Sequence, residues 1–262
     1  MKFYKTAQVA KIIGVHPNTV RFYENMKLLP AIPRTESGYR IFDDRHLEQL
    51  HLLRTAFRAE IISGSLRQEV YEIVKTAATS HIDGAYQQTK RYLYHLEEER
   101  LRAEEAIRIT LDLYEANPKT DEYAPYYGRP EVAKILGITT DVLRDWERNS
   151  LLHVPRDSRG YRKYGSKEMN RLKIIRILRN ANYSMMSILR MLNRLDKGDT
   201  NIRKIIDTPG EEEDIVCAAD RYITSLNMAE KDALEMLKIL DSMRKENTGD
   251  GLVDMENGPD IN

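Results

Sequence analysis

VAKIIGVHPNTVRFYENMKLL, from Val9 to Leu29, recurs in altered form as VAKILGITTDVLRDWERNSLL, from Val132 to Leu152. The two stretches lie 123 positions apart and share Val-Ala-Lys, Gly, Arg, Glu and Leu-Leu at matching places. The similarity resumes 122 positions apart, where residues 38–40 and 160–162 both read Gly-Tyr-Arg. Such self-similarity at a fixed spacing indicates a duplicated unit, here of about 70 residues.

One copy of this unit carries the signals of two short helices joined by a tight turn. Val9, Ile12 and Ile13 fall on one face of a helix. Gly14 is suited to ending that helix, because glycine adopts the left-handed conformation at low cost. Pro17 suits the first position of a second helix, where its missing N–H is no loss. The pattern predicts a helix-turn-helix.

The residues after the two helices predict a wing and further helices. Apolar and polar residues alternate from Ile32 to Phe42 around Glu36-Ser37-Gly38, which is typical of a β-hairpin. Further helices are expected from Leu47 to Phe57 and from about Leu66 to Thr76. We therefore expect a mainly α fold with two winged helix-turn-helix domains, each with a small β-hairpin wing and each followed by a long coiled-coil helix.

We call each winged helix-turn-helix domain a head. The stretches that follow the two heads predict the long helices. Residues 85–117 contain no Pro or Gly, and apolar side chains recur three and four positions apart, at Tyr86, Leu93, Leu96, Ala103, Ile107 and Tyr114. About residues 212–247 repeat this spacing with Ile215, Ala219, Tyr222, Leu226, Ala233, Leu237 and Leu240. The expected domains are a first head (1–80), a coiled-coil helix (85–117), a linker (118–126), a second head (127–200), a short segment with the second coiled-coil helix (201–247) and a disordered tail (248–262).

The distribution of charge favours DNA binding. The formal net charge is zero, yet residues 1–80 carry 12 Lys and Arg against 8 Asp and Glu, and residues 126–200 carry 16 against 8. The remaining residues carry 13 against 25. Basic blocks separated by acidic ones are typical of DNA-binding heads on a framework that does not bind DNA, and acidic helices also keep a protein soluble.

Composition also excludes several classes of protein. No apolar run reaches the roughly 20 residues of a membrane span, and the start MKFYKTAQVA lacks an apolar signal stretch, so we expect a cytoplasmic protein without membrane contact. The single cysteine, Cys217, allows no internal disulfide and no thiolate metal cluster. No metal or cofactor is expected. No catalytic triad or phosphate-binding glycine loop stands out, so we expect no enzyme.

The two stretches, together with SGYRIF (Ser37 to Phe42) and RGYRKY (Arg159 to Tyr164), resemble the MerR family of bacterial transcription regulators. The resemblance covers both heads. It implies a sequence-specific regulator that binds double-stranded promoter DNA, distorts the duplex and works with RNA polymerase. An architectural DNA-bending protein, such as a recombination directionality factor, shares the winged head and is the alternative.

The resemblance also implies which residues contact DNA phosphates. The second helix of each head enters the major groove, and its Arg and aromatic residue act with the Tyr and Arg of the wing. The matching residues are Arg21, Tyr23, Tyr39 and Arg40 in the first head and Arg144, Trp146, Tyr161 and Arg162 in the second. A guanidinium forks onto phosphate oxygens and a phenol donates to them. The indole of Trp146 offers one N–H, so packing inside the head is an equal alternative.

Base contacts are expected early in the second helix of each head. They fall on Pro17, Asn18 and Thr19 in the first head and on Thr140 and Asp141 in the second. Asparagine suits adenine and aspartate suits the cytosine amino group, so the heads should prefer different half-sites. His16 stands where the family usually has a capping serine, and we expect it to act as a solvent-facing cap, whereas Thr139 is an ordinary cap.

Two heads and two long helices are what two chains of an ordinary homodimer would supply. One hypothesis is that the helices pair antiparallel within one chain, so that a monomer is a pseudo-dimer on an asymmetric site. The alternative is a homodimer with four heads. Tyrosines such as Tyr86, Tyr92 and Tyr114 are expected in the helix seam, with a small-molecule pocket as the alternative.

Overall fold

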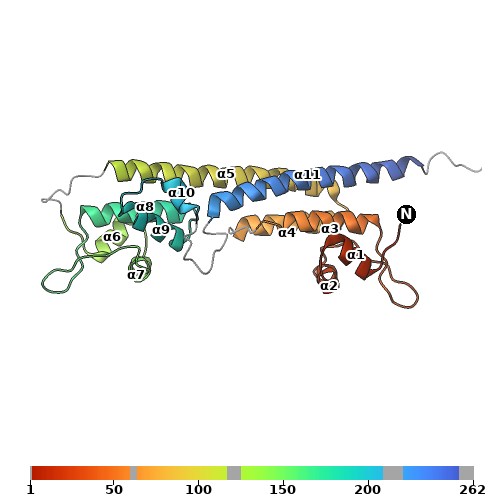
Figure 1. Cartoon of the computed structure of the whole chain (residues 1–262), viewed down its shortest axis with the longest axis horizontal. Coiled ribbons are helices and arrows are strands. Elements are labelled where there is room, and N and C mark those ends of the chain that lie inside the picture. The colour runs from red at the N-terminus through yellow and green to blue at the C-terminus, as the bar shows by residue number, and fades with distance from the viewer. Residues whose placement is uncertain (1, 60–63, 117–124, 209–220, 254–262) are drawn as a thin grey trace, which may run out of the picture. The chain divides into compact units, whose positions relative to one another are not determined.

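The computed structural model describes residues 2–59, 64–116, 125–208 and 221–253. The chain forms two compact units, one built from residues 1–97 with 226–262 and the other from residues 98–225. Each unit holds one head and part of each of the two long helices, α5 (Ile82–Glu115) and α11 (Tyr222–Val253) (Figure 1). Among the helices that the structure describes, none combines the length and apolar character needed to cross a bilayer.

The first head begins with the predicted helix-turn-helix. Its helices are α1 (Thr6–Ile13), α2 (Pro17–Asn25), α3 (Asp44–Ala56) and α4 (Gly64–Ala78). α1 ends at Gly14, whose φ of 72° is left-handed. The imidazole Nδ1 of His16 accepts the N–H of Asn18 at 3.2 Å, which confirms that this histidine caps α2.

The second head repeats this arrangement. Its helices are α6 (Arg129–Leu136), α7 (Thr140–Arg148), α8 (Ser166–Asn180), α9 (Met185–Leu195) and α10 (Ile202–Ile206). α6 ends at Gly137 with φ of 63°, and the Thr139 hydroxyl oxygen accepts the N–H of Val142 at 3.2 Å. The duplication in sequence is therefore a duplication of turn geometry.

Matching side chains form the cores of the two heads. Each head buries a valine of its first helix, an aliphatic residue of its second, the aromatic residue that ends the wing and two aliphatic residues of the next helix. They are Val9, Val20, Phe42, Leu50 and Leu53 in the first head and Val132, Leu143, Tyr164, Leu172 and Ile175 in the second. Burying one such side chain contributes roughly 1.5–3 kcal/mol.

Each wing is closed by one antiparallel bridge, without the regular strands of the predicted β-hairpin. The bridges join Arg34 to Arg40 and Arg156 to Arg162, and only isolated bridges occur in the part of the chain that the structure describes. The backbone oxygen of Pro33 accepts from the Ile41 N–H at 2.9 Å. Proline has no N–H to return, and Pro155 occupies the same place in the second wing, so the ladder cannot extend there.

The long helices differ from the prediction at their ends. α5 begins at Ile82 and ends at Glu115, where residues 85–117 were expected. α11 begins at Tyr222 and continues to Val253, so it includes residues 248–253, which were assigned to a disordered tail. The glycines that suggested the tail disfavour a helix by about 1 kcal/mol each, but they do not remove a backbone donor. Residues 117–124, 209–220 and 254–262, and with them Cys217, Ile215 and Ala219, lie outside the described residues.

The two long helices pair antiparallel inside the first unit. Arg244 of α11 forms an ion pair with Asp83 at the start of α5, with 3.0 Å between Nε and Oδ1. Burial, with the charges of Glu69 and of Asp232 in α11, raises the pKa of Tyr92, which lies further along α5. Tyr92 and Leu96 are buried, whereas Tyr86, Leu93 and Tyr114 of the predicted seam are only half-buried.

Candidate nucleic-acid interface

The outer face of α2 carries two of the residues predicted to meet DNA in the first head. Val20 anchors the helix in the core, and the opposite face exposes Asn18, Arg21, Phe22 and Asn25. The Arg21 guanidinium donates to the Asn18 side-chain oxygen at 2.8 Å, so a predicted phosphate contact and a predicted base contact lie side by side. Pro17 and Thr19 are half-buried beside them.

The outer face of α7 has the same geometry and a different charge pattern. It exposes Asp141, Arg144, Asp145 and Arg148, and Thr140 is half-buried at its start. Arg144 forms an ion pair with Asp141, and Arg148 forms one with Asp145 at 3.4 Å. The predicted base contact Asp141 is thus paired with the predicted phosphate contact Arg144.

The predicted aromatic contacts separate into exposed and buried residues. Tyr39 and Tyr161 lie in the wing turns, and 72% and 71% of their surface is exposed. Tyr23 of α2 is half-buried. Trp146, its counterpart in α7, is only 5% exposed, so the indole packs inside the head and the expected phosphate contact is not available at the surface.

A glutamate that ends the second-helix motif ties each wing to its helix. In the first head, Glu24 accepts from Arg40 at 2.6 Å and from Arg34 at 3.4 Å. In the second, Glu147 accepts from Arg162 and from the Tyr164 hydroxyl, both at 2.5 Å. Arg40 and Arg162 were predicted as phosphate contacts, and the structure shows that the Nε of each holds the wing in place.

Glu147 has one more partner than Glu24. The Nη2 of Arg129 lies 2.9 Å from both carboxylate oxygens. Burial by itself would raise the pKa of Glu147, but the hydrogen bonds from Tyr164 and Arg129 and the charge of Arg162 outweigh it, and the pKa lies below its usual value. Burial and the Glu147 charge raise the pKa of Tyr164. The second wing is therefore held by a buried, ionised carboxylate.

These glutamates had no role in the sequence-based prediction. The signal was present, because Glu24 and Glu147 are identical at matching places in two modules that differ at most exposed positions. A carboxylate within a DNA-binding helix repels phosphates unless cations neutralise it. One cationic partner of each glutamate, Arg40 or Arg162, lies in the wing, and the prediction assigned it to DNA alone.

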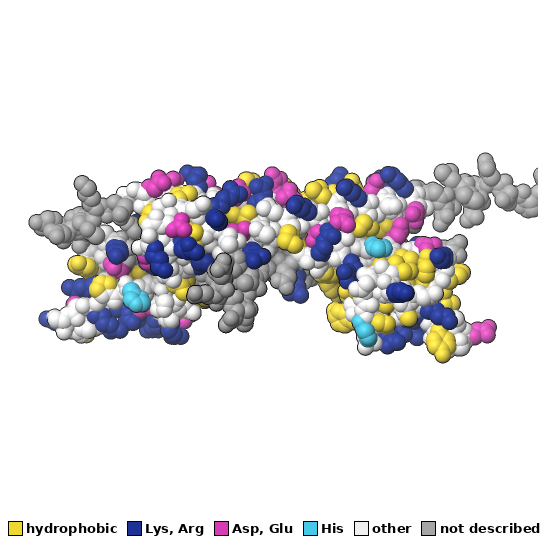
Figure 2. Space-filling view, in the orientation of Figure 1, with side chains coloured by type: hydrophobic (Ala, Val, Ile, Leu, Met, Phe, Trp, Pro, Cys, Tyr) yellow, Lys and Arg dark blue, Asp and Glu magenta, His cyan; other side chains and the backbone are white. Residues whose placement is uncertain are grey.

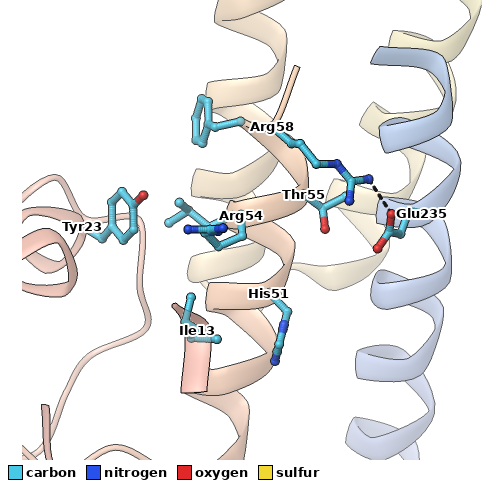
Figure 3. A pocket seen from close by; sticks show the side chains of 9 residues that line it. Ile13, Tyr23, His51, Arg54, Thr55, Arg58 and Glu235 are labelled. Carbon is cyan, nitrogen blue, oxygen red and sulfur yellow. Dashed lines mark hydrogen bonds and ion pairs between the residues drawn. The ribbon is translucent and has the colours of Figure 1, made fainter. Parts of the chain in front are cut away.

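In the first head, side chains of α3 and of the residues just after it face α2 on one side and α11 on the other. A hollow is lined by Ile13, Tyr23, His51, Leu53, Arg54, Thr55, Phe57, Arg58 and Glu235. Figure 3 shows Tyr23 facing Arg54 on one side of α3 and Arg58 turned toward Glu235 of α11 on the other. Arg54 donates to the Gly14 oxygen at 3.4 Å, and Arg58 binds Glu235 at 2.6 Å and also pairs with Asp232.

The basic surface of each head lies on the side that carries the second helix and the wing. In each head taken by itself, Lys and Arg side chains gather along this edge (Figure 2). In the second wing, Arg156 also donates to the Gly160 oxygen at 2.9 Å, which braces the turn beside Tyr161. Each head therefore presents a helix and a rigid wing on one cationic edge, which suits the phosphates and groove of a duplex.

Comparison with known proteins identifies the family. The family model described as MerR family regulatory protein matches residues 5–42, and the one described as MerR HTH family regulatory protein matches residues 130–195. The HTH-type transcriptional regulator YfmP of Bacillus subtilis (strain 168) is 32% identical over 113 residues, which is 43% of this chain and 75% of that protein. The chain belongs to the MerR family of regulatory proteins. The predicted family and the predicted duplication of its head are confirmed.

Other MerR relatives match over shorter stretches. The mercuric resistance operon regulatory protein of Bacillus cereus is 37% identical over 54 residues, 21% of this chain and 40% of that protein. The regulator CueR of Yersinia pestis is 44% identical over 50 residues, 19% of this chain and 36% of that protein. A crystal structure of HiNmlR, a MerR family regulator bound to promoter DNA, is 24% identical with a TM-score of 0.24, and covers 54% of this chain and 96% of that chain.

Proposed function

We propose that this MerR-family chain is a sequence-specific transcription regulator that binds double-stranded promoter DNA through both heads. One observation carries the proposal: each head presents an exposed second-helix face beside an exposed wing tyrosine, and a Glu–Arg contact fixes the wing against that helix. Preorganised donors on one surface are what phosphate recognition requires. Relatives that match part of this chain are transcriptional regulators by name.

Within this proposal the predicted contacts keep their roles, with two changes. Arg21, Tyr23, Tyr39, Arg144 and Tyr161 bind phosphates, and Pro17, Asn18, Thr19, Thr140 and Asp141 lie at the base edges. Arg40 and Arg162 position the wing through Nε and offer only their outer N–H groups to DNA. Trp146 is left out because it is buried.

Selection of bound duplexes from a random DNA pool tests the proposal. We expect enrichment of a site with two different half-sites. Arg21→Ala should then weaken binding to every sequence and reduce the salt slope by about 1, because a phosphate contact carries no sequence information. Asn18→Ala should change preference in one half-site only. A pool without enrichment, or equal effects of the two variants, contradicts the proposal.

We also propose that one chain does the work of a dimer on an asymmetric site. The antiparallel contact between α5 and α11 of the same chain supports this, because it uses within one chain the helix surface that a second chain would otherwise cover. Sedimentation at micromolar concentration should give a mass near 30.5 kDa. Twice that mass would favour the homodimer with four heads.

Distortion of promoter DNA and cooperation with RNA polymerase complete the proposal by analogy with the family. A bend or an untwisting of the selected duplex, measured by the separation of fluorophores on its ends, is the expected signature. An architectural protein such as a recombination directionality factor would also bend DNA. Genome-wide binding separates the two, because a regulator occupies promoters and a directionality factor occupies attachment sites.

A further inference from the structure

The second helices of the two heads, α2 and α7, share their geometry but differ in the charge of their exposed faces. At matching positions, α7 has Asp141 and Asp145 where α2 has Asn18 and Phe22. Both aspartates point outward, with 77% and 57% of their side-chain surface exposed. The exposed face of α2 carries no acid, because its single glutamate is turned to the wing.

In the part of the chain that the structure describes, these aspartates take part in ion pairs within α7, and Asp141 also lies in the first turn of α7, where the helix dipole favours an acid. Asp141 pairs with Arg144, and Asp145 pairs with Arg148, each three residues further along the helix. Exposed pairs of this kind contribute little and open readily. The two arginines can therefore turn to phosphates, which leaves two carboxylates facing the groove.

A carboxylate in the major groove accepts hydrogen bonds and donates none. Cytosine offers an amino group there, whereas guanine and thymine offer acceptor oxygens, and adenine places an acceptor nitrogen beside its amino group. At any base other than cytosine, the aspartate lies next to an acceptor atom while it is partly desolvated. The side chains of α2 are more tolerant: an amide donates and accepts, and an exposed phenyl packs on a thymine methyl.

We propose that Asp141 and Asp145 make the second head the discriminating head, rejecting half-sites without cytosine amino groups, while the first head accepts a wider range of sequences. This inference rests on the proposed DNA binding. It assigns a division of labour: α2 supplies tolerant affinity and α7 supplies selectivity. It also adds Asp145 and Phe22 to the residues that determine the site.

The test compares three full-length proteins in selection from a random DNA pool. They are the wild type, the double variant Asp141→Asn with Asp145→Asn, and a control, Glu105→Gln with Asp112→Asn. The control removes two acids that pair with Arg108 on the exposed face of α5, so it makes the same change in net charge away from the heads. Circular dichroism should show that all three proteins keep their helices.

The wild type should select a site with one half that demands cytosine and one half with a weaker base preference. The α7 double variant should lose the cytosine preference and bind unrelated duplexes roughly ten-fold more tightly, while the control should not. The reciprocal variant, Asn18→Asp with Phe22→Asp, should make the half with the weaker preference demand cytosine.

Three results would overturn the inference. They are an unchanged preference in the α7 double variant, a change no larger than that of the control, or lower thermal stability of the double variant with the same selected site. The last result would show that the aspartates only stabilise the helix. A wild type that selects no duplex at all would instead refute the proposed function itself.

Discussion

One carboxylate in each head connects the recognition helix to the wing, and the second head depends on it more. The Glu147 side chain is 10% exposed and accepts from three donors, whereas Glu24 is 21% exposed and accepts from two. Glu147→Gln should therefore lower the free energy of unfolding by about 2 kcal/mol, because it leaves buried donors and cations without their charge partner.

Urea denaturation measures this effect. The exposed pair of Glu105 with Arg108 provides the control, and Glu105→Gln should give no measurable change. Glu24→Gln should fall between the two. Equal stability of Glu147→Gln and the wild type would show that the wing is held by packing alone.

The lowered pKa of Glu147 also predicts a pH dependence. The ordinary pKa is 4.5 and the folded value lies below it, so the carboxylate stabilises the fold fully above about pH 4.5. That contribution is lost as pH falls through the folded pKa. The difference in unfolding free energy between wild type and Glu147→Gln should therefore be constant near neutral pH and shrink in acid. A difference independent of pH would contradict the assignment.

Single residues were predictable where a repeated pattern named them. The histidine cap of α2 followed from its position, where the resemblance implies a capping serine, and the structure confirms it. The burial of Trp146 was left open, because one letter cannot tell a packed indole from one at the surface. The wing contacts of Arg40 and Arg162 were missed, since a sequence does not show which charges neutralise one another.

At the scale of elements, α3 is held to α11 by a contact that joins residues far apart in the chain. Arg58, at the end of α3, pairs with Asp232 and Glu235. Asp232 is only 5% exposed, so Arg58→Ala would leave a buried carboxylate without its cation. We expect a loss of about 2 kcal/mol in unfolding free energy, a value reduced because Arg58 itself is half-exposed.

The control for this prediction is Arg108→Ala on the exposed face of α5, which should not alter stability measurably. The double variant Arg58→Ala with Asp232→Asn should recover part of the loss, because the uncompensated charge is then gone. If Arg58→Ala and Arg108→Ala have the same unfolding free energy, the contact of Arg58 with Asp232 and Glu235 does not hold α11 to the head.

Hydrophobic periodicity predicted where the long helices lie better than it predicted which residues contact them. The spacing placed both long helices, and Leu96, Ala103, Leu226 and Ala233 are buried as expected. Other residues of the long helices are buried too, such as Thr89 and Asp232, and Asp232 pairs with Arg58 of the first head. Arg58 and Asp232 are 174 residues apart in the chain, so no local pattern in the sequence predicts their contact.

For the whole molecule, the duplication supplies two similar heads whose exposed residues have diverged. The core positions are hydrophobic in both copies and the glutamate that ties the second helix to the wing is identical, whereas residues 18 and 22 differ from residues 141 and 145. The parts that set the fold of a head are thus shared, and the parts that would read bases are not. A chain with two such heads gains more from joint binding than from either head alone, because the second contact becomes intramolecular.

Disabling one head at a time tests whether the heads act together on one site. Arg21→Ala with Tyr39→Ala removes exposed contacts of the first head, and Arg144→Ala with Tyr161→Ala removes the matching contacts of the second. On a duplex with both half-sites, each variant should bind roughly 10²–10⁴-fold more weakly than the wild type, because the effective concentration of the second head is lost. On a duplex just long enough to hold the half-site of the intact head, variant and wild type should bind alike, because the other head then has no phosphates to contact. Fluorescence anisotropy at one fixed salt concentration measures both. If a variant binds the full duplex like the wild type, the disabled head does not take part in recognising that site, and the chain does not act as a dimer in one polypeptide.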